Sequence, residues 1–137
     1  MTSMHEEMMT VRLAGAVSQG AAIDTSVAGA LVSVPRGKVD ADDLVFRAVR
    51  GDLQELGIER GDLLIVEPRP DGNAATAELV LTLISERAFV GRWWAKHGRR
   101  SLLDHALQTI ADGAELRVLG AITVVLRASL AQSRRTP

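Results

Sequence analysis

The chain has 137 residues, a formal net charge of −1 and 47% hydrophobic residues, and it contains no cysteine. This length suits one domain with a single core and is too short for two. The balanced charge argues against a general attraction to nucleic acid or anionic membranes, and the lack of cysteine excludes disulfides and thiolate metal sites. The two Trp and two Phe are the only aromatic residues, so an aliphatic core is expected.

The two ends of the chain are expected to lie outside the core. Residues 1–10 are polar and rich in Met, without the apolar block of a signal peptide, and we expect them to form a flexible arm. The apolar run at 121–126 is far shorter than the ~20 residues of a membrane span. We therefore expect one domain over residues 11–130, a polar tail over 131–137, and a cytoplasmic protein.

Short β-prone runs separated by turns follow one another along the chain. The predicted elements are a strand at 11–17, an extended segment to 34, a turn at 35–37, strands at 44–49 and 63–67, a hairpin of 79–85 and 88–94, a basic turn at 96–100, and a strand at 116–126. One helical turn is expected within 51–57, while 102–110 fits either a short helix or a strand with a loop. The compact run Leu63–Val66 predicts a buried central strand. This pattern predicts a mainly-β single domain of short twisted strands.

Four segments together resemble one protein family. They are Phe46–Asp52 with the following Gly57–Ile58, then Gly61–Val66, the hairpin 79–94, and 116–127. In this order they resemble the peptidase domain of the LexA/UmuD family of self-cleaving Ser-Lys peptidases. The sequence Gly-Asp-Leu-Leu-Ile-Val at 61–66 is nearly identical to the family motif. The resemblance implies a signal-peptidase-like β-domain; the alternative is that all four segments are ordinary strands of another β-domain.

The residues that carry the family's chemistry are missing from this chain. The resemblance implies a Ser nucleophile and a neutral Lys base that together cut a bond of the same chain. The nucleophile position holds Asp52 or Leu53, depending on the alignment, and the base position holds Gly91. The neighbouring Arg92 cannot give up its proton. The cleavable bond corresponds to Gln19–Gly20, which keeps the Gly but lacks the small residue before it, so we expect a vestigial cleavage site and no catalysis.

An active hydrolase with a relocated nucleophile is the alternative to a lost one. The candidate side chains are Ser85 and Ser101 with His97 and His105, and His5 is the third histidine. No Gly-x-Ser-x-Gly elbow marks either serine, and we expect these side chains to be surface groups. The acidic stretch within 24–43 lacks the alternation of a calcium loop and is expected to be a solvated turn. We expect neither a metal site nor a cofactor.

A cluster of tryptophan and basic residues follows the predicted hairpin. The candidate partner-binding residues are Arg92, Trp93, Trp94, Lys96, Arg99 and Arg100. An exposed Trp among cations suits base stacking and phosphate neutralisation. The alternative, which we favour, places one Trp in the core and the other against a subunit or an Arg stem.

The strand predicted at 116–126 has apolar residues on both faces. One face carries Leu119, Ala121, Thr123 and Val125, which we expect to form a homodimer interface, because an exposed apolar patch invites association. The alternative is that another part of the chain covers this face. The family resemblance also implies dimerisation through the closing strand.

These observations lead to one expected function and two alternatives. We expect a non-catalytic pseudo-peptidase that acts as a dimeric protein-interaction or regulatory module. The first alternative, which the resemblance implies, is a UmuD-like accessory subunit of an error-prone polymerase in DNA-damage tolerance and the SOS response. The second is a small nucleic-acid-binding module that uses the Arg92–Arg100 hairpin.

Overall fold

The fold is mainly β, as predicted, in a computed structural model that describes residues 7–113 and 115–127. The strands are β1 (Met8–Arg12), β2 (Gly15–Val17), β3 (Leu31–Pro35), β4 (Leu44–Ala48), β5 (Leu63–Pro68), β6 (Leu79–Ile84), β7 (Arg87–Lys96), β8 (Arg99–Leu103), β9 (Thr109–Asp112) and β10 (Arg117–Leu126). Two single-turn 3-10 helices, η1 (Arg36–Lys38) and η2 (Gln54–Leu56), complete the regular structure of the described residues. No helix in this part of the chain is long and apolar enough to span a bilayer.

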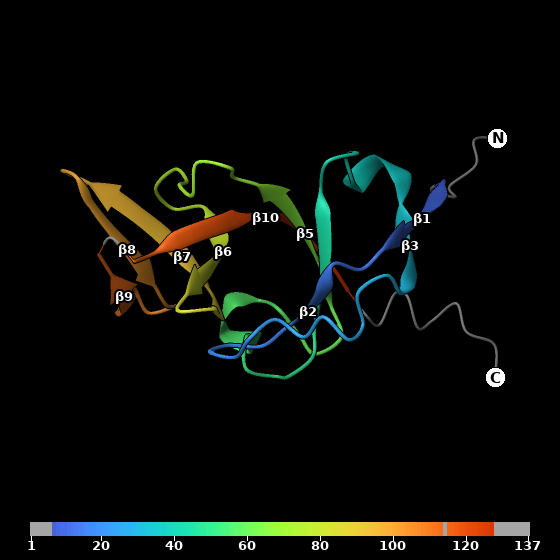
Figure 1. Ribbon diagram of the computed structural model, residues 1–137, viewed down its shortest axis with the longest axis horizontal. Helices are drawn as coiled ribbons and strands as arrows, with labels where there is room; N and C mark the ends of the chain where they lie inside the picture. The colour runs from blue at the N-terminus through green and yellow to red at the C-terminus, as the bar shows by residue number, and fades with distance from the viewer. Residues whose placement is uncertain (1–6, 114, 128–137) are drawn as a thin grey trace.

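The strands form one large curled sheet and a separate two-stranded ribbon. The large sheet has the order β2-β4-β5-β10-β6-β7-β8-β9, and β1 pairs with β3. The β2–β4 pair is parallel, whereas the other neighbouring pairs are antiparallel. Figure 1 shows β10 across the middle of an elongated molecule, with β7 to β9 at one end and the β1–β3 ribbon at the other.

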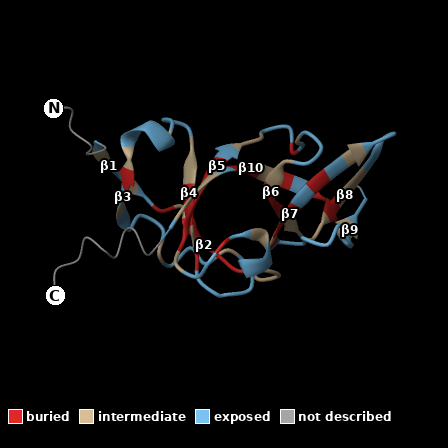
Figure 2. Ribbon diagram, turned by 180° about the vertical axis from the view of Figure 1, so that it is seen from behind, coloured by how far each residue is buried: buried red, intermediate tan, exposed pale blue. Residues whose placement is uncertain are grey.

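The run Leu63–Val66 forms the buried central strand that the sequence predicts. β5 lies between β4 and β10, and Leu64, Ile65 and Val66 are 0% exposed. Figure 2 shows buried residues concentrated in these middle strands. The Gly61–Asp62 turn before β5 is closed by the buried Asp62 carboxylate, which accepts a hydrogen bond from the Glu59 N–H at 2.8 Å.

Two tight turns build the meander from β6 to β8. Ser85 and Glu86 join β6 to β7 with φ values of 50° and 67°, and His97 and Gly98 join β7 to β8 with φ values of 53° and 76°. Two successive positive φ angles match the right-handed twist of an antiparallel pair. The basic turn expected at 96–100 is therefore shorter, and β7 and β8 extend on either side of it. The segment 102–110 contains the end of β8, a loop and the start of β9, so the strand alternative holds there.

Several predicted boundaries differ from those observed, most of them by one or two residues. The strand expected at 11–17 is divided into β1 and β2, and β1 begins at Met8, within the segment expected to be an arm. The first six residues and the expected tail at 131–137 lie outside the described residues. β10 follows its prediction within one residue at its start, but its pairing register shifts between Val118 and Gly120 and again between Ile122 and Val124.

Candidate functional site

The segment around the Gln19–Gly20 bond lies against the edge of β7. The Gly20 N–H donates to the Ala88 carbonyl at 2.8 Å, and the Ala88 N–H donates to the Ala21 carbonyl at 2.8 Å. These bonds form an isolated antiparallel bridge between Ala21 and Ala88. The N-terminal segment thus covers β7 just before the point where β8 begins to pair with it.

The side chain of Gln19 extends this pairing by one more residue. Its Nε2 donates to the Val90 carbonyl at 2.9 Å, and its Oε1 accepts from the Val90 N–H at 2.7 Å. The primary amide therefore satisfies both backbone groups of a β7 residue, as a neighbouring strand would. Sequence reasoning singled out Gln19 only through the resemblance and missed this role. A lone glutamine before glycine carries no signal for it.

The candidate nucleophile position meets the same segment. The Oδ2 of Asp52 accepts a hydrogen bond from the backbone N–H of Gln19 at 3.0 Å. The next residue, Leu53, is 2% exposed and packs in the core cluster that also contains Val17 and Val90. The structure thus brings together Asp52, the Gln19–Gly20 bond and the part of β7 next to Gly91.

Gly91 itself is closely surrounded by β8. A Cβ atom added there would lie 2.6 Å from the carbonyl oxygen of Leu103 and 2.9 Å from Cγ of Leu102. The first contact is with backbone, so a side chain at this position requires β7 and β8 to move apart. The position that the resemblance assigns to the base therefore has no side chain, and the packing leaves no room for one.

The alternative hydrolytic groups are dispersed. Ser85 lies in the β6–β7 turn and His97 in the β7–β8 turn, whereas Ser101 lies on β8. Within residues 7–113 and 115–127, no hydrogen bond joins either serine to a histidine, and no group of three potential ligands is placed to hold a metal ion. His105 instead pairs with Glu55, at 2.5 Å between Nε2 and Oε2. His5 lies outside the described residues.

The acidic stretch is built from turn-capping side chains. Asp24 accepts a hydrogen bond from the Ser26 hydroxyl at 2.6 Å and another from the Ser26 N–H at 2.9 Å. These two bonds, the hydroxyl first, lower the pKa of Asp24 below its ordinary value. Asp43 similarly accepts from the Asp40 N–H at 2.8 Å. The local hydrogen bonds account for these carboxylates without a ligand.

The β7–β8 hairpin separates the six candidate partner-binding residues into two groups. Arg92, Trp94 and Lys96 are exposed, while the intervening Trp93 is 0% exposed and Trp94 is 42% exposed. Arg99 is exposed at the start of β8. Arg100 is half-buried and places its guanidinium 5.9 Å from the centre of the Trp93 ring. One Trp is therefore core, as the favoured interpretation predicts, and the other is on the surface.

The predicted interface residues on β10 do not share one exposed face. Ala121 is 2% exposed, and Thr123 is exposed. Leu119 and Val125 are half-buried and pack against the core cluster that contains Leu53. The two register shifts in β10 break the strict alternation on which the prediction was based. A groove of about 440 Å³ lies beside this strand, between Leu79 and Val125. The homodimer interface stays a prediction.

Comparison with known proteins does not assign the chain to a class. No model of a known protein family matches it, and no curated protein matches it. The resemblance to the LexA/UmuD family therefore rests on the sequence motifs alone.

Proposed function

We propose that this chain is a non-catalytic pseudo-peptidase that acts as a cytoplasmic, dimeric protein-interaction module. One observation carries the proposal. The positions that the family resemblance assigns to the nucleophile and the cleavable bond are in contact at Asp52 and Gln19, and the position assigned to the base follows Val90, which Gln19 holds. These contacts support an interpretation in which the segment is held in place at positions that lack the reactive groups the resemblance implies.

The contact between Asp52 and Gln19 supports a positioning role for Asp52, which holds the segment around Gln19–Gly20, and argues against a role in cleaving it. The N–H that Asp52 binds belongs to the Ser18–Gln19 peptide bond, which precedes the bond that the family cuts. A carboxylate that accepts a hydrogen bond from an amide positions that amide and does not attack the next carbonyl carbon. Covalent cleavage needs a nucleophile and an adjacent base, and Gly91 offers no side chain for the second role.

The first test is incubation of the full chain at alkaline pH, where a family-type Lys base would lose its proton. We expect the intact mass to remain unchanged over the time course, with a sample at neutral pH as the control. A product that ends at Gln19 would contradict the proposal. The double variant Asp52→Ser, Gly91→Lys should also stay uncut, because the β8 backbone occupies the space around position 91.

The identity of the partner requires a separate experiment. Affinity purification of the tagged full chain from its native cells, followed by mass spectrometry, should recover the same protein from the parent and from the Asp52→Asn variant, which removes only a charge. The accessory role beside an error-prone polymerase rests on the resemblance alone. Recovery of a DNA polymerase would favour it over other protein partners.

A further inference from the structure

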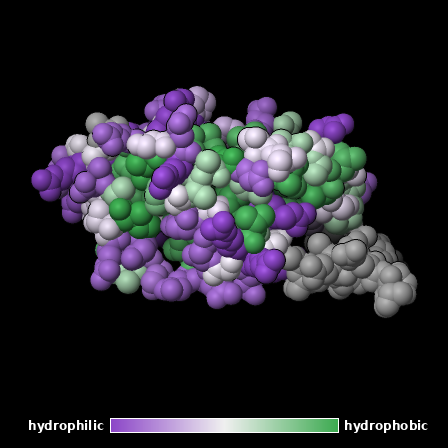
Figure 3. Space-filling model, turned by 60° about the horizontal axis from the view of Figure 1, so that its bottom comes forward, coloured by the Kyte–Doolittle hydropathy of each residue, from purple (hydrophilic) through white to green (hydrophobic). Residues whose placement is uncertain are grey.

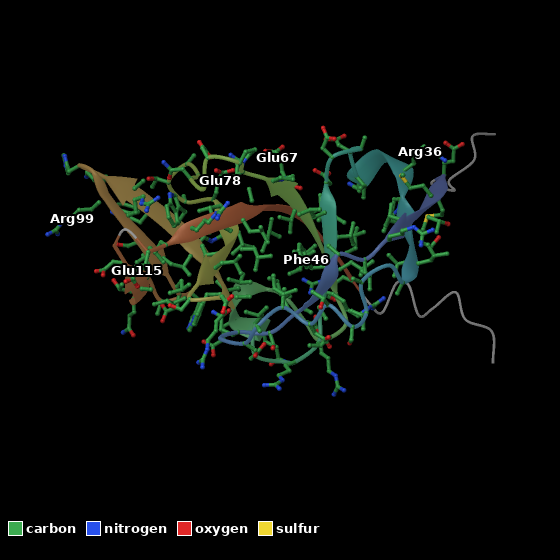
Figure 4. The ribbon with its side chains drawn as sticks, viewed as in Figure 1. Arg36, Phe46, Glu67, Glu78, Arg99 and Glu115 are labelled. Atoms are coloured by element: carbon green, nitrogen blue, oxygen red, sulfur yellow. The ribbon has the colours of Figure 1, made fainter. Side chains whose placement is uncertain are left out.

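The exposed face of the β7–β8 hairpin gathers positive charge around one indole. Register pairs Arg92 with Leu103, Trp94 with Ser101, and Lys96 with Arg99, and paired residues of antiparallel strands share a face. Figure 2 shows buried and exposed residues alternating along β7 where this hairpin leaves the core. Figure 4 shows Arg99 at the tip of the hairpin, pointing away from the molecule. We call Arg92, Trp94, Lys96 and Arg99 the hairpin face.

The cations of the hairpin face are not neutralised by the chain's own carboxylates. Among the residues that the structure describes, Arg92, Lys96 and Arg99 form no ion pair, in contrast to Arg36 and Arg69. The Arg92 guanidinium donates a hydrogen bond of 3.3 Å to the Ala77 carbonyl. These charges are available to an anionic partner, although the whole chain has a net charge of −1.

Hydrogen bonds from residues 76 and 77 to β7 fix the backbone conformation of the hairpin in the absence of a ligand. Thr76 Oγ1 accepts from the Ala95 N–H at 2.9 Å and donates to the Ala95 carbonyl at 2.8 Å, so the edge of β7 remote from β8 is occupied. The Ala77 N–H donates to the Trp93 carbonyl at 2.7 Å. A rigid platform loses little conformational entropy on binding.

A groove continues from the hairpin face toward η2. It has a volume of about 430 Å³, and Trp94, Arg92 and the 71% exposed Leu107 line it. Glu55 lies on its η2 side and is already paired with His105. This volume is sufficient for a planar group the size of a base. The combination is a stacking surface beside a largely apolar recess, with Arg92 and Glu55 among the residues that line the recess.

We propose that the hairpin face and this groove bind single-stranded nucleic acid, a function beyond the protein interactions proposed above. One base stacks on Trp94, and the flanking phosphates contact Lys96 and Arg99. Base stacking is indifferent to sequence, since every base presents a π-face, and it requires unpaired bases. A duplex keeps its bases stacked on one another, and the carboxylates of an acidic peptide offer no ring to Trp94. The chemistry therefore selects a single strand over both.

Fluorescence provides a direct test, because Trp93 is buried and Trp94 is the exposed tryptophan. A labelled oligothymidylate of about twelve nucleotides is titrated with the full chain at low salt, and anisotropy and Trp quenching are followed together. We expect quenching that saturates with the anisotropy. Trp94→Ala should weaken binding by about tenfold or more. The double variant Lys96→Gln, Arg99→Gln should reduce the magnitude of the negative slope of log K against log salt by about 1.4.

Matched controls distinguish this face from general charge. Arg87→Gln removes a charge from the opposite end of β7 and should leave the anisotropy curve unchanged. Because Trp94 is on the surface, its replacement should leave the thermal midpoint and the far-ultraviolet spectrum intact. The proposal is overturned by an absence of binding at low salt or by Trp94→Ala binding as tightly as the parent. Equal competition by the matching duplex, or by polyglutamate at equal charge, overturns it as well.

Discussion

Gln19 shows how a single side chain can take the place of a strand. Its amide satisfies the N–H and the carbonyl of Val90, and its own backbone N–H is held by Asp52. Val90 is 1% exposed, so little water can reach it. Without the Gln19 amide, the backbone N–H and carbonyl of Val90 would lose their hydrogen-bond partners. The segment 18–21 is therefore anchored at both its main chain and its side chain.

Replacing Gln19 by Met tests this anchor, because Met has similar length and lacks the amide. Two partly buried hydrogen bonds are lost, and we expect the free energy of unfolding to fall by about 1–2 kcal/mol. The Val90 amide should exchange its hydrogen faster in the same variant. The control is Gln108→Met, at an exposed position, which should change neither quantity. Unchanged protection of Val90 would mean that the Gln19 amide does not hold the segment.

Strand patterns predict some elements of this chain well and others poorly. The run Leu63–Val66 is uniformly apolar behind a Gly-Asp turn, and its burial follows directly. β2 and β9 have three and four residues, too few for a period to emerge. In β10 both alternating sets of residues are apolar, so the sequence does not reveal where the bulges change the side that each residue faces.

The candidate site was predictable in its positions and not in its contacts. The resemblance to the LexA/UmuD family singles out Asp52, Gly91 and the Gln19–Gly20 bond. The contact of Gln19 with Val90 joins residues 71 positions apart, and only the fold provides it. The sequence also leaves open which of the two adjacent Trp residues is buried, because alternation fixes that they differ but not which faces inward.

The central strand β5 carries a stability prediction. Ile65 is 0% exposed and belongs to a core cluster that also contains Val34 and Val45. Ile65→Ala should lower the free energy of unfolding by about 2–5 kcal/mol, through lost burial and the cavity left behind. Denaturant unfolding measures the change. Leu31→Ala, at a position 62% exposed, is the control and should stay within about 0.5 kcal/mol of the parent. A near-zero change at Ile65 would contradict its burial.

At the scale of the molecule, one face presents its apolar surface in separate areas. On the side that Figure 3 displays, hydrophobic patches alternate with hydrophilic side chains, and no single apolar face dominates this view. Charged groups also form bridges over the sheet, since Arg69 pairs with Glu67 at 3.1 Å and with Glu78 at 2.7 Å. Figure 4 shows these two glutamates on the same side of the molecule. The groove beside β10 is the candidate patch for the predicted association of two copies.

Thr123 offers the cleanest test of the predicted homodimer. Leu119 and Val125 pack partly against the core, so a charge at either position would disturb the monomer as well as an interface. Thr123 is exposed and makes one hydrogen bond of 3.3 Å, from its hydroxyl to the Ile65 carbonyl. Thr123→Glu would bury an unpaired charge in a two-fold interface and should yield a monomer, whereas the parent should be a dimer by light scattering.

The matched control places the same charge on another exposed threonine. Thr109 begins β9 at the far end of the large sheet, and Thr109→Glu should remain dimeric if β10 forms the interface. Matching far-ultraviolet spectra of the two variants would show that the loss of association is not a loss of folding. If the parent chain is itself monomeric at micromolar concentration, the dimer is wrong. The half-buried side chains of β10 would then be covered within the monomer alone, by the core cluster that Leu119 and Val125 already contact.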